Sequence, residues 1–123
     1  MTTLVKLGET DGGIAASDIA ANLAVKWHTV AGQITPCGAG DIPIGYTQDA
    51  IPSGATGTFY RAGRGNRILV ATTGSPTAGY HLMCGALGVL VAETSPTTPT
   101  LFTVGQASEA AGSDALCMVS TTP

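Results

Sequence analysis

The chain has 123 residues, of which 11% are charged and 44% are hydrophobic, with a formal net charge of -3 and a pI near 5.0. This length predicts one domain with a single core. The acidic balance excludes general nucleic-acid binding, which needs a basic face, although it allows a local basic patch. A surface so poor in charge predicts that part of it is covered by a partner.

Apolar runs in the chain extend over only a few residues, so the sequence predicts no transmembrane helix. The start of the chain, MTTLVKLGETDGG, has one lysine and no apolar segment typical of a signal peptide, which favours synthesis and use in the cytoplasm or assembly there. The cysteines Cys37, Cys84 and Cys117 are widely spaced and odd in number, unlike a secreted disulfide framework. We expect them to be buried free thiols.

The first 20 residues are expected to form an N-terminal arm, followed by a β-barrel domain over residues 21–123. Residues 4–8 contain a short β-like run, and the polar, glycine-containing segment after it predicts an arm or an edge strand. Residues 14–23 leave two structures open. Ser17 or Asp18 could cap a helical turn there, but the run is too short for a stable helix.

Short apolar runs in the rest of the chain alternate as β-strands do and are separated by Gly, Pro, Asn and Ser. They cover residues 23–30, 33–36, 44–47, 57–61, 67–72, 81–84, 89–92, 101–105 and 115–119. In the first run Leu23, Val25 and Trp27 share one face, which predicts that Trp27 is an anchor of the core. Many short strands without a long helical period predict an all-β barrel or sandwich.

A pattern of turn and apolar residues occurs twice in the chain, with an offset between 56 and 60 residues. The matching pairs are Asn22 and Gly79, Val25 and Leu82, Gly32 and Gly88, Ile34 and Leu90, Gly45 and Gly105, and Gly54 and Gly112. Asn and Gly tolerate a positive φ better than other residues, so Asn22 and Gly79 predict the same kind of turn. The sequence therefore predicts a single domain with two related halves.

The residues needed for catalysis form no recognisable constellation in this sequence. The histidines His28 and His81 both lie in strand candidates, and no G-x-S-x-G motif is present. A nucleophilic set converges in space rather than in sequence, so an enzyme is kept as the third hypothesis. His81 and Cys84 could be combined with His28 and Cys37 as metal ligands, but strand residues three apart point to opposite faces. We expect no enzymatic activity, no cofactor and no metal.

Basic residues gather in one segment, YRAGRGNR, where Arg61, Arg64 and Arg67 fall within seven positions. The glycines between them predict a flexible hairpin loop with a local positive charge. Three interpretations stay open: a solvated loop, docking on an acidic protein surface, and, least favoured, nucleic-acid binding. Arginine pairs well with carboxylates, which supports the second interpretation.

Longer motifs of the chain are AVKWHTVAGQITPCGAGDIPIGYTQDAIPSGATGTFY, ILVATTGSPTAGYHLMCGALGVLV and VGQASEAAGSD, all within residues 20–119. They contain a strand ending in Lys-Trp, a Gly turn, an Ile-Gly motif followed by an acidic-Ala pair, and a second copy with Val-Gly and another acidic-Ala pair. This order of motifs resembles the small cement, or head decoration, proteins of tailed bacteriophages.

The resemblance implies a small β-barrel or β-tulip on the outer capsid surface of the virion, made in the host cytoplasm. Such proteins often form homotrimers that clamp neighbouring major capsid proteins, and the resemblance implies neither nucleic acid nor a membrane as a partner. Their N-terminal arm commonly extends to the capsid or to a neighbouring subunit. Residues expected to make capsid or intersubunit contacts are Leu4, Val5, Lys6, Leu7, Arg61, Arg64 and Arg67.

An alternative function is a carbohydrate-binding or adhesive β-module. This function requires exposed aromatic platforms, and several of the few aromatic residues occupy positions that alternation predicts to be in the core.

Overall fold

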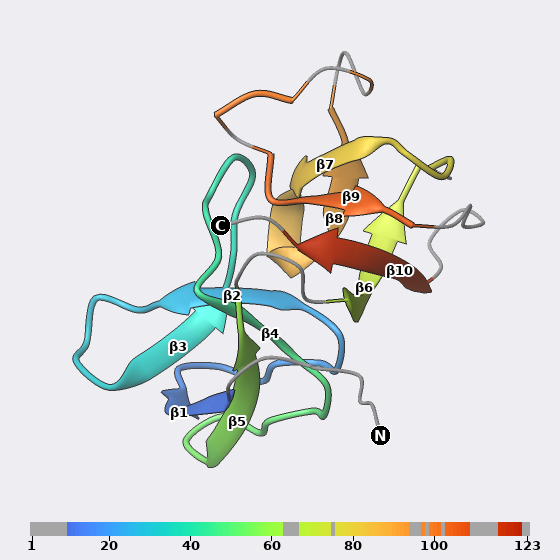
Figure 1. The fold of residues 1–123 in the computed structure, drawn as a ribbon. Helices are drawn as coiled ribbons and strands as arrows, with labels where there is room; N and C mark the ends of the chain where they lie inside the picture. The colour runs from blue at the N-terminus through green and yellow to red at the C-terminus, as the bar shows by residue number, and fades with distance from the viewer. Residues whose placement is uncertain are drawn as a thin grey trace.

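The computed structural model describes residues 10–62, 67–74, 76–93, 97, 99–101, 103–108 and 116–121. They form short strands and one 3-10 turn, η1 (Ala86–Gly88), as Figure 1 shows. The strands are β1 (Thr10–Ala15), β2 (Ala24–Trp27), β3 (Gln33–Pro36), β4 (Gly45–Thr47), β5 (Thr56–Arg61), β6 (Arg67–Thr73), β7 (His81–Cys84), β8 (Leu90–Ala92), β9 (Gly105–Ala107) and β10 (Leu116–Thr121). The predicted all-β fold class is confirmed.

The strands close into two barrels, one from each half of the chain. The first has the order β1-β3-β2-β4-β5 and the second the order β10-β6-β8-β7-β9. Each barrel contains one parallel pair, β1 with β3 and β6 with β8, while its other pairs are antiparallel. Strands β1 to β5 therefore correspond in order to β6 to β10, and the prediction of two related halves is confirmed.

Strand register extends this correspondence to single residues. Val25 pairs with Gly45 in the first barrel, and Leu82 pairs with Gly105 in the second. The turns agree as well, because φ is 64° at Asn22 and 90° at Gly79, and 79° at Gly32 and 78° at Gly88. The repeat read from the sequence thus matches equivalent positions in two copies of one fold.

The core of the first barrel consists of apolar side chains that point inward from its strands and loops: Ala15, Ile19, Val25, Ile34, Ile51 and Phe59. Gly45 is required beside this core, since a Cβ atom at that position would lie 2.4 Å from the Phe59 ring. The core of the second barrel also takes in Ala24, Cys37 and Tyr46 from the first barrel. Residues of both barrels therefore share one apolar cluster.

Strand β1 lies inside the segment expected as an arm, and it pairs with both β3 and β5. Its Gly12 and Gly13 looked like turn residues in the sequence. In the barrel a Cβ atom at Gly13 would lie 2.8 Å from the Ile34 side chain, so the glycine makes room for a core residue. Residues 1–9, including the β-like run, lie outside the described residues.

Two further segments differ from the sequence prediction. No helical turn forms around Asp18, whose side chain instead accepts a hydrogen bond from the Ser53 amide at 2.8 Å. The strand expected at residues 101–105 is displaced, because β9 covers Gly105–Ala107. Adjacent Val104 is buried outside the strand, which explains why its apolar character suggested one.

The prediction that Trp27 anchors the core is wrong, because its side chain is 47% exposed. Alternation placed it on the same face as Val25, which is fully buried inside the barrel. Trp27 is the last residue of β2, so its inward direction leads to the mouth of the barrel rather than to its centre. There its ring meets the Phe59 ring edge to face, with 6.1 Å between the centroids.

Candidate functional site

The contact between the barrels is built from an outward face of the first barrel and the mouth of the second. Tyr46 and Ala24 lie opposite each other on β4 and β2, with Tyr60 beside them on β5. These side chains pack on the apolar cluster of the second barrel that includes Cys84 and Val119. We call Ala24, Tyr46 and Tyr60 the plug of the first barrel.

Backbone hydrogen bonds connect the same two surfaces. The Gly88 amide donates to the Cys37 carbonyl at 2.7 Å, and the Gly40 amide donates to the Cys84 carbonyl at 2.9 Å. On the other side of the contact, the Ala71 amide donates to the Asn22 carbonyl at 2.8 Å. Strand edges and turns of both barrels are therefore locked in one arrangement.

The thiols of Cys37 and Cys84 meet at this contact, and both are buried and free, as the sequence predicted for them. Their mutual hydrogen bond and burial raise the pKa of the Cys37 thiol. Burial likewise raises the pKa of the Tyr46 phenol, whose hydroxyl has no hydrogen-bond partner among the described residues. The same hydrogen bond lowers the pKa of the Cys84 thiol, while the raised pKa values keep Cys37 and Tyr46 neutral near pH 7, where they serve packing.

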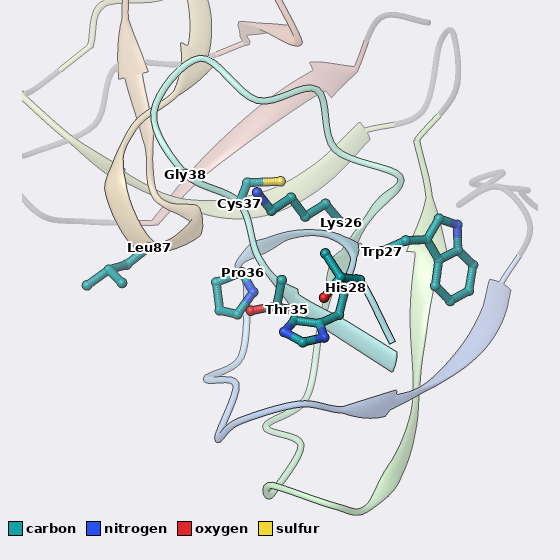
Figure 2. A pocket seen from close by; sticks show the side chains of 9 residues that line it. Lys26, Trp27, His28, Thr35, Pro36, Cys37, Gly38 and Leu87 are labelled. Carbon is teal, nitrogen blue, oxygen red and sulfur yellow. The ribbon is translucent and has the colours of Figure 1, made fainter. Parts of the chain in front are cut away.

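A groove of about 420 Å³ runs between the β2–β3 hairpin and η1. Figure 2 shows Lys26, His28 and Thr35 along one wall and Leu87, from the second barrel, at the opposite end. Trp27 also lines the groove, and Leu87 is 75% exposed. The groove thus combines polar groups with apolar side chains, among them Pro36 and Leu87, at the boundary between the barrels.

An ion pair between Lys26 and Asp41 holds the Lys26 side chain in place at this groove. Their Nζ and Oδ2 atoms are 2.7 Å apart, and the same oxygen accepts the Gly38 amide at 2.7 Å. The hydrogen bonds from Lys26 and then from the Gly38 amide lower the pKa of Asp41, and Asp41 in turn raises the pKa of Lys26. Both side chains are partly exposed, so the pair organises the loop more than it stabilises the fold.

The mouth of the first barrel forms a second depression, with a volume of about 260 Å³. Trp27 and Phe59 lie at its apolar side, and Asp11 and Arg61 bring one carboxylate and one guanidinium to it. Its remaining lining residues are Pro43, Ile44 and Ala62. An aromatic ring beside two opposite charges suits a partner that has both apolar and polar groups.

Only one of the predicted contact residues has a described side chain. Arg61 ends β5, is exposed and belongs to the mouth of the first barrel. Arg67 begins β6, but its side chain lies outside the described part of the protein, as do residues 4–7 and Arg64 as a whole. Sequence reasoning missed Trp27 as a surface residue, and the signal for it was its position at the end of a short strand, next to the hairpin turn.

A buried carboxylate in the second barrel has a structural role. Glu93 is 5% exposed and accepts hydrogen bonds from the hydroxyls of Thr100 and Thr103, while its amide donates to the His81 carbonyl at 3.0 Å. These bonds hold the end of β8 to the loop that leads to β9. Satisfied hydrogen bonds of this kind are what a buried carboxylate requires.

The described residues contain neither a metal-binding cluster nor a membrane-spanning helix. Within them, His, Cys, Asp and Glu form no cluster of three or more that could hold a metal ion. In the same part of the chain, none of the helices has the length and apolar character needed to cross a membrane.

Comparison with known proteins identifies the fold. The structure is similar to the crystal structure of the N base of head fiber gp8.5 in bacteriophage phi29, with a TM-score of 0.77, 17% sequence identity and 93% of each chain covered. No protein-family model matches the chain, and no curated protein matches it. The protein therefore shares the whole two-barrel architecture of a head fiber base.

Proposed function

We propose that the protein is a structural protein of a tailed-phage head, which binds the outer surface of the expanded capsid and stabilises contacts between major capsid proteins. The observation that carries this proposal is the similarity to a head fiber base over 93% of both chains. A likeness confined to one barrel would carry less weight, because small barrels serve many functions.

The chemistry of the described residues is compatible with this role. Capsid binding needs a rigid scaffold and surfaces that can be buried, and it needs no catalytic group, so we propose that the protein is not an enzyme. The hydrogen bonds and the apolar packing between the two barrels supply the rigidity. Many copies on one capsid would add modest contacts into a large total, and a homotrimer would multiply them further.

The N-terminal segment and the arginine loop remain the proposed contacts with the capsid or a neighbouring subunit. Because β1 begins at Thr10, a deletion that tests the arm should remove residues 1–9 and leave the barrel strand intact. We expect this deletion to weaken capsid binding with little change in melting temperature. Arg61→Ala, Arg64→Ala and Arg67→Ala should weaken binding in a salt-dependent manner if these side chains meet carboxylates.

The test of the proposed function is binding to undecorated, expanded capsids of the same phage. Purified protein is added, the particles are pelleted, and bound copies per capsid are counted at saturation. We expect a fixed stoichiometry related to the capsid symmetry and a greater resistance of the particles to heat. Absence of binding to expanded capsids would overturn the proposal, and unexpanded capsids serve as the matched control.

A second candidate, carbohydrate binding, is favoured by one observation. The exposed ring of Trp27 stands beside Asp11 and Arg61 at a depression of about 260 Å³, and an aromatic platform with charged neighbours is suited to a sugar. A glycan array tests this candidate. Binding that is lost in Trp27→Ala would support it, and the absence of binding to any glycan would exclude it for the set used.

A further inference from the structure

The two barrels are equivalent, but their mouths are in different environments. In the second barrel the mouth residues Ile68, Cys84 and Val119 are all buried, because the plug of the first barrel covers them. Register makes Asp11, Trp27 and Phe59 their equivalents in the first barrel. There Asp11 and Trp27 are exposed beside the open depression, while Phe59 is buried and contacts the Trp27 ring, so the difference between the two mouths lies at Asp11 and Trp27.

The glycine turn next to each mouth shows the same difference. A Cβ atom at Gly88 would lie 2.6 Å from the Ala24 carbonyl oxygen, because the first barrel is seated on that turn. Gly32 has the same backbone conformation, with φ of 79° against 78°, and a Cβ atom there would have no neighbour within 4 Å. Ile14, the equivalent of Ala71 at this surface, is 39% exposed.

We propose that the open mouth of the first barrel is the docking site for a second copy of this chain, which inserts the corresponding plug of its second barrel. The plug of the first barrel is centred on Ala24 and Tyr46, and the equivalent positions in the second barrel are His81 and Gln106, which pair with each other across β7 and β9. The contact between two molecules would then have the same arrangement as the contact that joins the two barrels within one molecule.

Side-chain size is complementary in the proposed contact. Inside the molecule a large plug residue, Tyr46, meets a mouth with the small Cys84. Between molecules the smaller Gln106 would meet the large Trp27. Exchanging large for small on both sides keeps the volume at the contact similar, as close packing requires.

Polarity is complementary as well. The apolar plug inside the molecule covers an apolar mouth, whereas the open mouth has Asp11 and Arg61 at its rim. The corresponding plug is polar: Gln106 is exposed, and its Nε2 atom donates to the Gly79 carbonyl at 2.9 Å, which leaves its carbonyl oxygen and a second N–H for a partner, and the partly exposed His81 ring lies opposite it. An imidazole and an amide can exchange hydrogen bonds with a carboxylate and a guanidinium.

Contacts of this kind are heterologous, since mouth and plug are different surfaces. A head-to-tail contact produces a closed ring when its rotation closes and a filament when it does not. A trimeric ring is one such closed form. The proposal needs no capsid, so its failure and that of the proposed function are distinguishable.

The experiment is sedimentation velocity of the full chain over a wide concentration range. We expect wild-type protein to associate as concentration rises, and Trp27→Ala and Gln106→Tyr each to raise the dissociation constant by at least about tenfold. The first change leaves a hole at the contact and the second overfills it. Circular dichroism confirms that each variant is folded, and Leu101→Ala, at an exposed position that belongs to neither the mouth nor the plug, should associate like wild type.

An equal mixture of the two variants provides the decisive measurement. A chain with Trp27→Ala keeps a native plug and a chain with Gln106→Tyr keeps a native mouth, so the mixture contains matched surfaces and should associate again. The double variant, which pairs a small mouth residue with a large plug residue, should also associate. A wild-type chain that stays monomeric, or a mixture that associates no better than its components, would overturn the proposal.

Discussion

Trp27 and Phe59 contact each other edge to face, yet one is 47% exposed and the other 2%. Their different burial follows from position along the strands: Phe59 lies beneath the mouth, while Trp27 ends β2 at the rim. Aromatic residues at such rims combine a large contact area with low conformational freedom, which suits a docking surface. The residue that looked most like a core anchor is therefore the one best placed for recognition.

Substituting these two rings should affect stability to different degrees. Trp27→Ala removes an edge contact at the surface and should lower the free energy of unfolding by about 1 to 2 kcal/mol. Phe59→Ala opens a cavity in the core of the first barrel and should cost about 3 to 5 kcal/mol. Urea unfolding of both variants measures the difference, and equal losses would show that Trp27 is packed as a core residue.

The carboxylate of Asp41 should report its ion pair through its titration. Its pKa is lowered by Lys26 and the Gly38 amide, so the pair's stabilising effect is present at neutral pH and is lost as pH falls through the lowered pKa. Lys26→Gln should move the pKa of Asp41 upward, toward its ordinary value. NMR titration of the carboxyl carbon measures this shift, and an unchanged pKa would mean that the Gly38 amide alone sets it.

At the scale of the element, equivalent turns have acquired different functions. The turns at Gly32 and Gly88 share a left-handed backbone, which glycine adopts without the steric cost that Cβ imposes. Only the second turn lies under the other barrel, where its amide donates to the Cys37 carbonyl. The same turn shape is thus a surface turn at Gly32 and part of the contact between the barrels at Gly88.

This difference predicts unequal costs for the same substitution. Gly32→Ala should cost about 1 to 2 kcal/mol, from the left-handed backbone alone. Gly88→Ala carries the same backbone cost and also forces Cβ against the Ala24 carbonyl oxygen, so it should destabilise the protein by at least about 1 kcal/mol more. Thermal or urea unfolding compares the two variants, and equal destabilisation would show that the contact between the barrels yields easily.

At the scale of the whole molecule, one apolar cluster spans both barrels. Tyr46, Ala24 and Cys37 of the first barrel belong to the same cluster as Leu82 and Leu90 of the second. Removing one barrel would expose the apolar mouth of the other, which carries a large hydrophobic cost. The two barrels are therefore parts of one domain in the energetic sense.

We expect the two barrels to unfold together in a single transition. Trp27, the one tryptophan of the chain, reports on the first barrel by fluorescence, while far-UV circular dichroism reports on the strands of both. The two signals should give the same urea midpoint. A fluorescence midpoint clearly below the midpoint from circular dichroism would show that the first barrel unfolds independently.

By itself the sequence determined the all-β class, most strand positions and the internal repeat. These features follow from local rules: alternation along a strand, and the need for Asn22, Gly32, Gly79 and Gly88 wherever φ is positive. These rules did not predict strand β1, because two consecutive glycines, Gly12 and Gly13, are typical of a turn. Gly13 is needed in the strand because a side chain there would collide with Ile34, which is far from it in the sequence.

Only the tertiary structure decided that each half closes into its own barrel and which mouth is covered. Periodicity assigns a residue to a face, but it does not state how far along the barrel axis that face is still enclosed. Trp27 and Cys84 occupy equivalent positions, and the presence of a barrel above one and not above the other makes the first a surface residue and the second a core residue. That outcome depends on how whole barrels pack, which is set by contacts between residues far apart in the sequence.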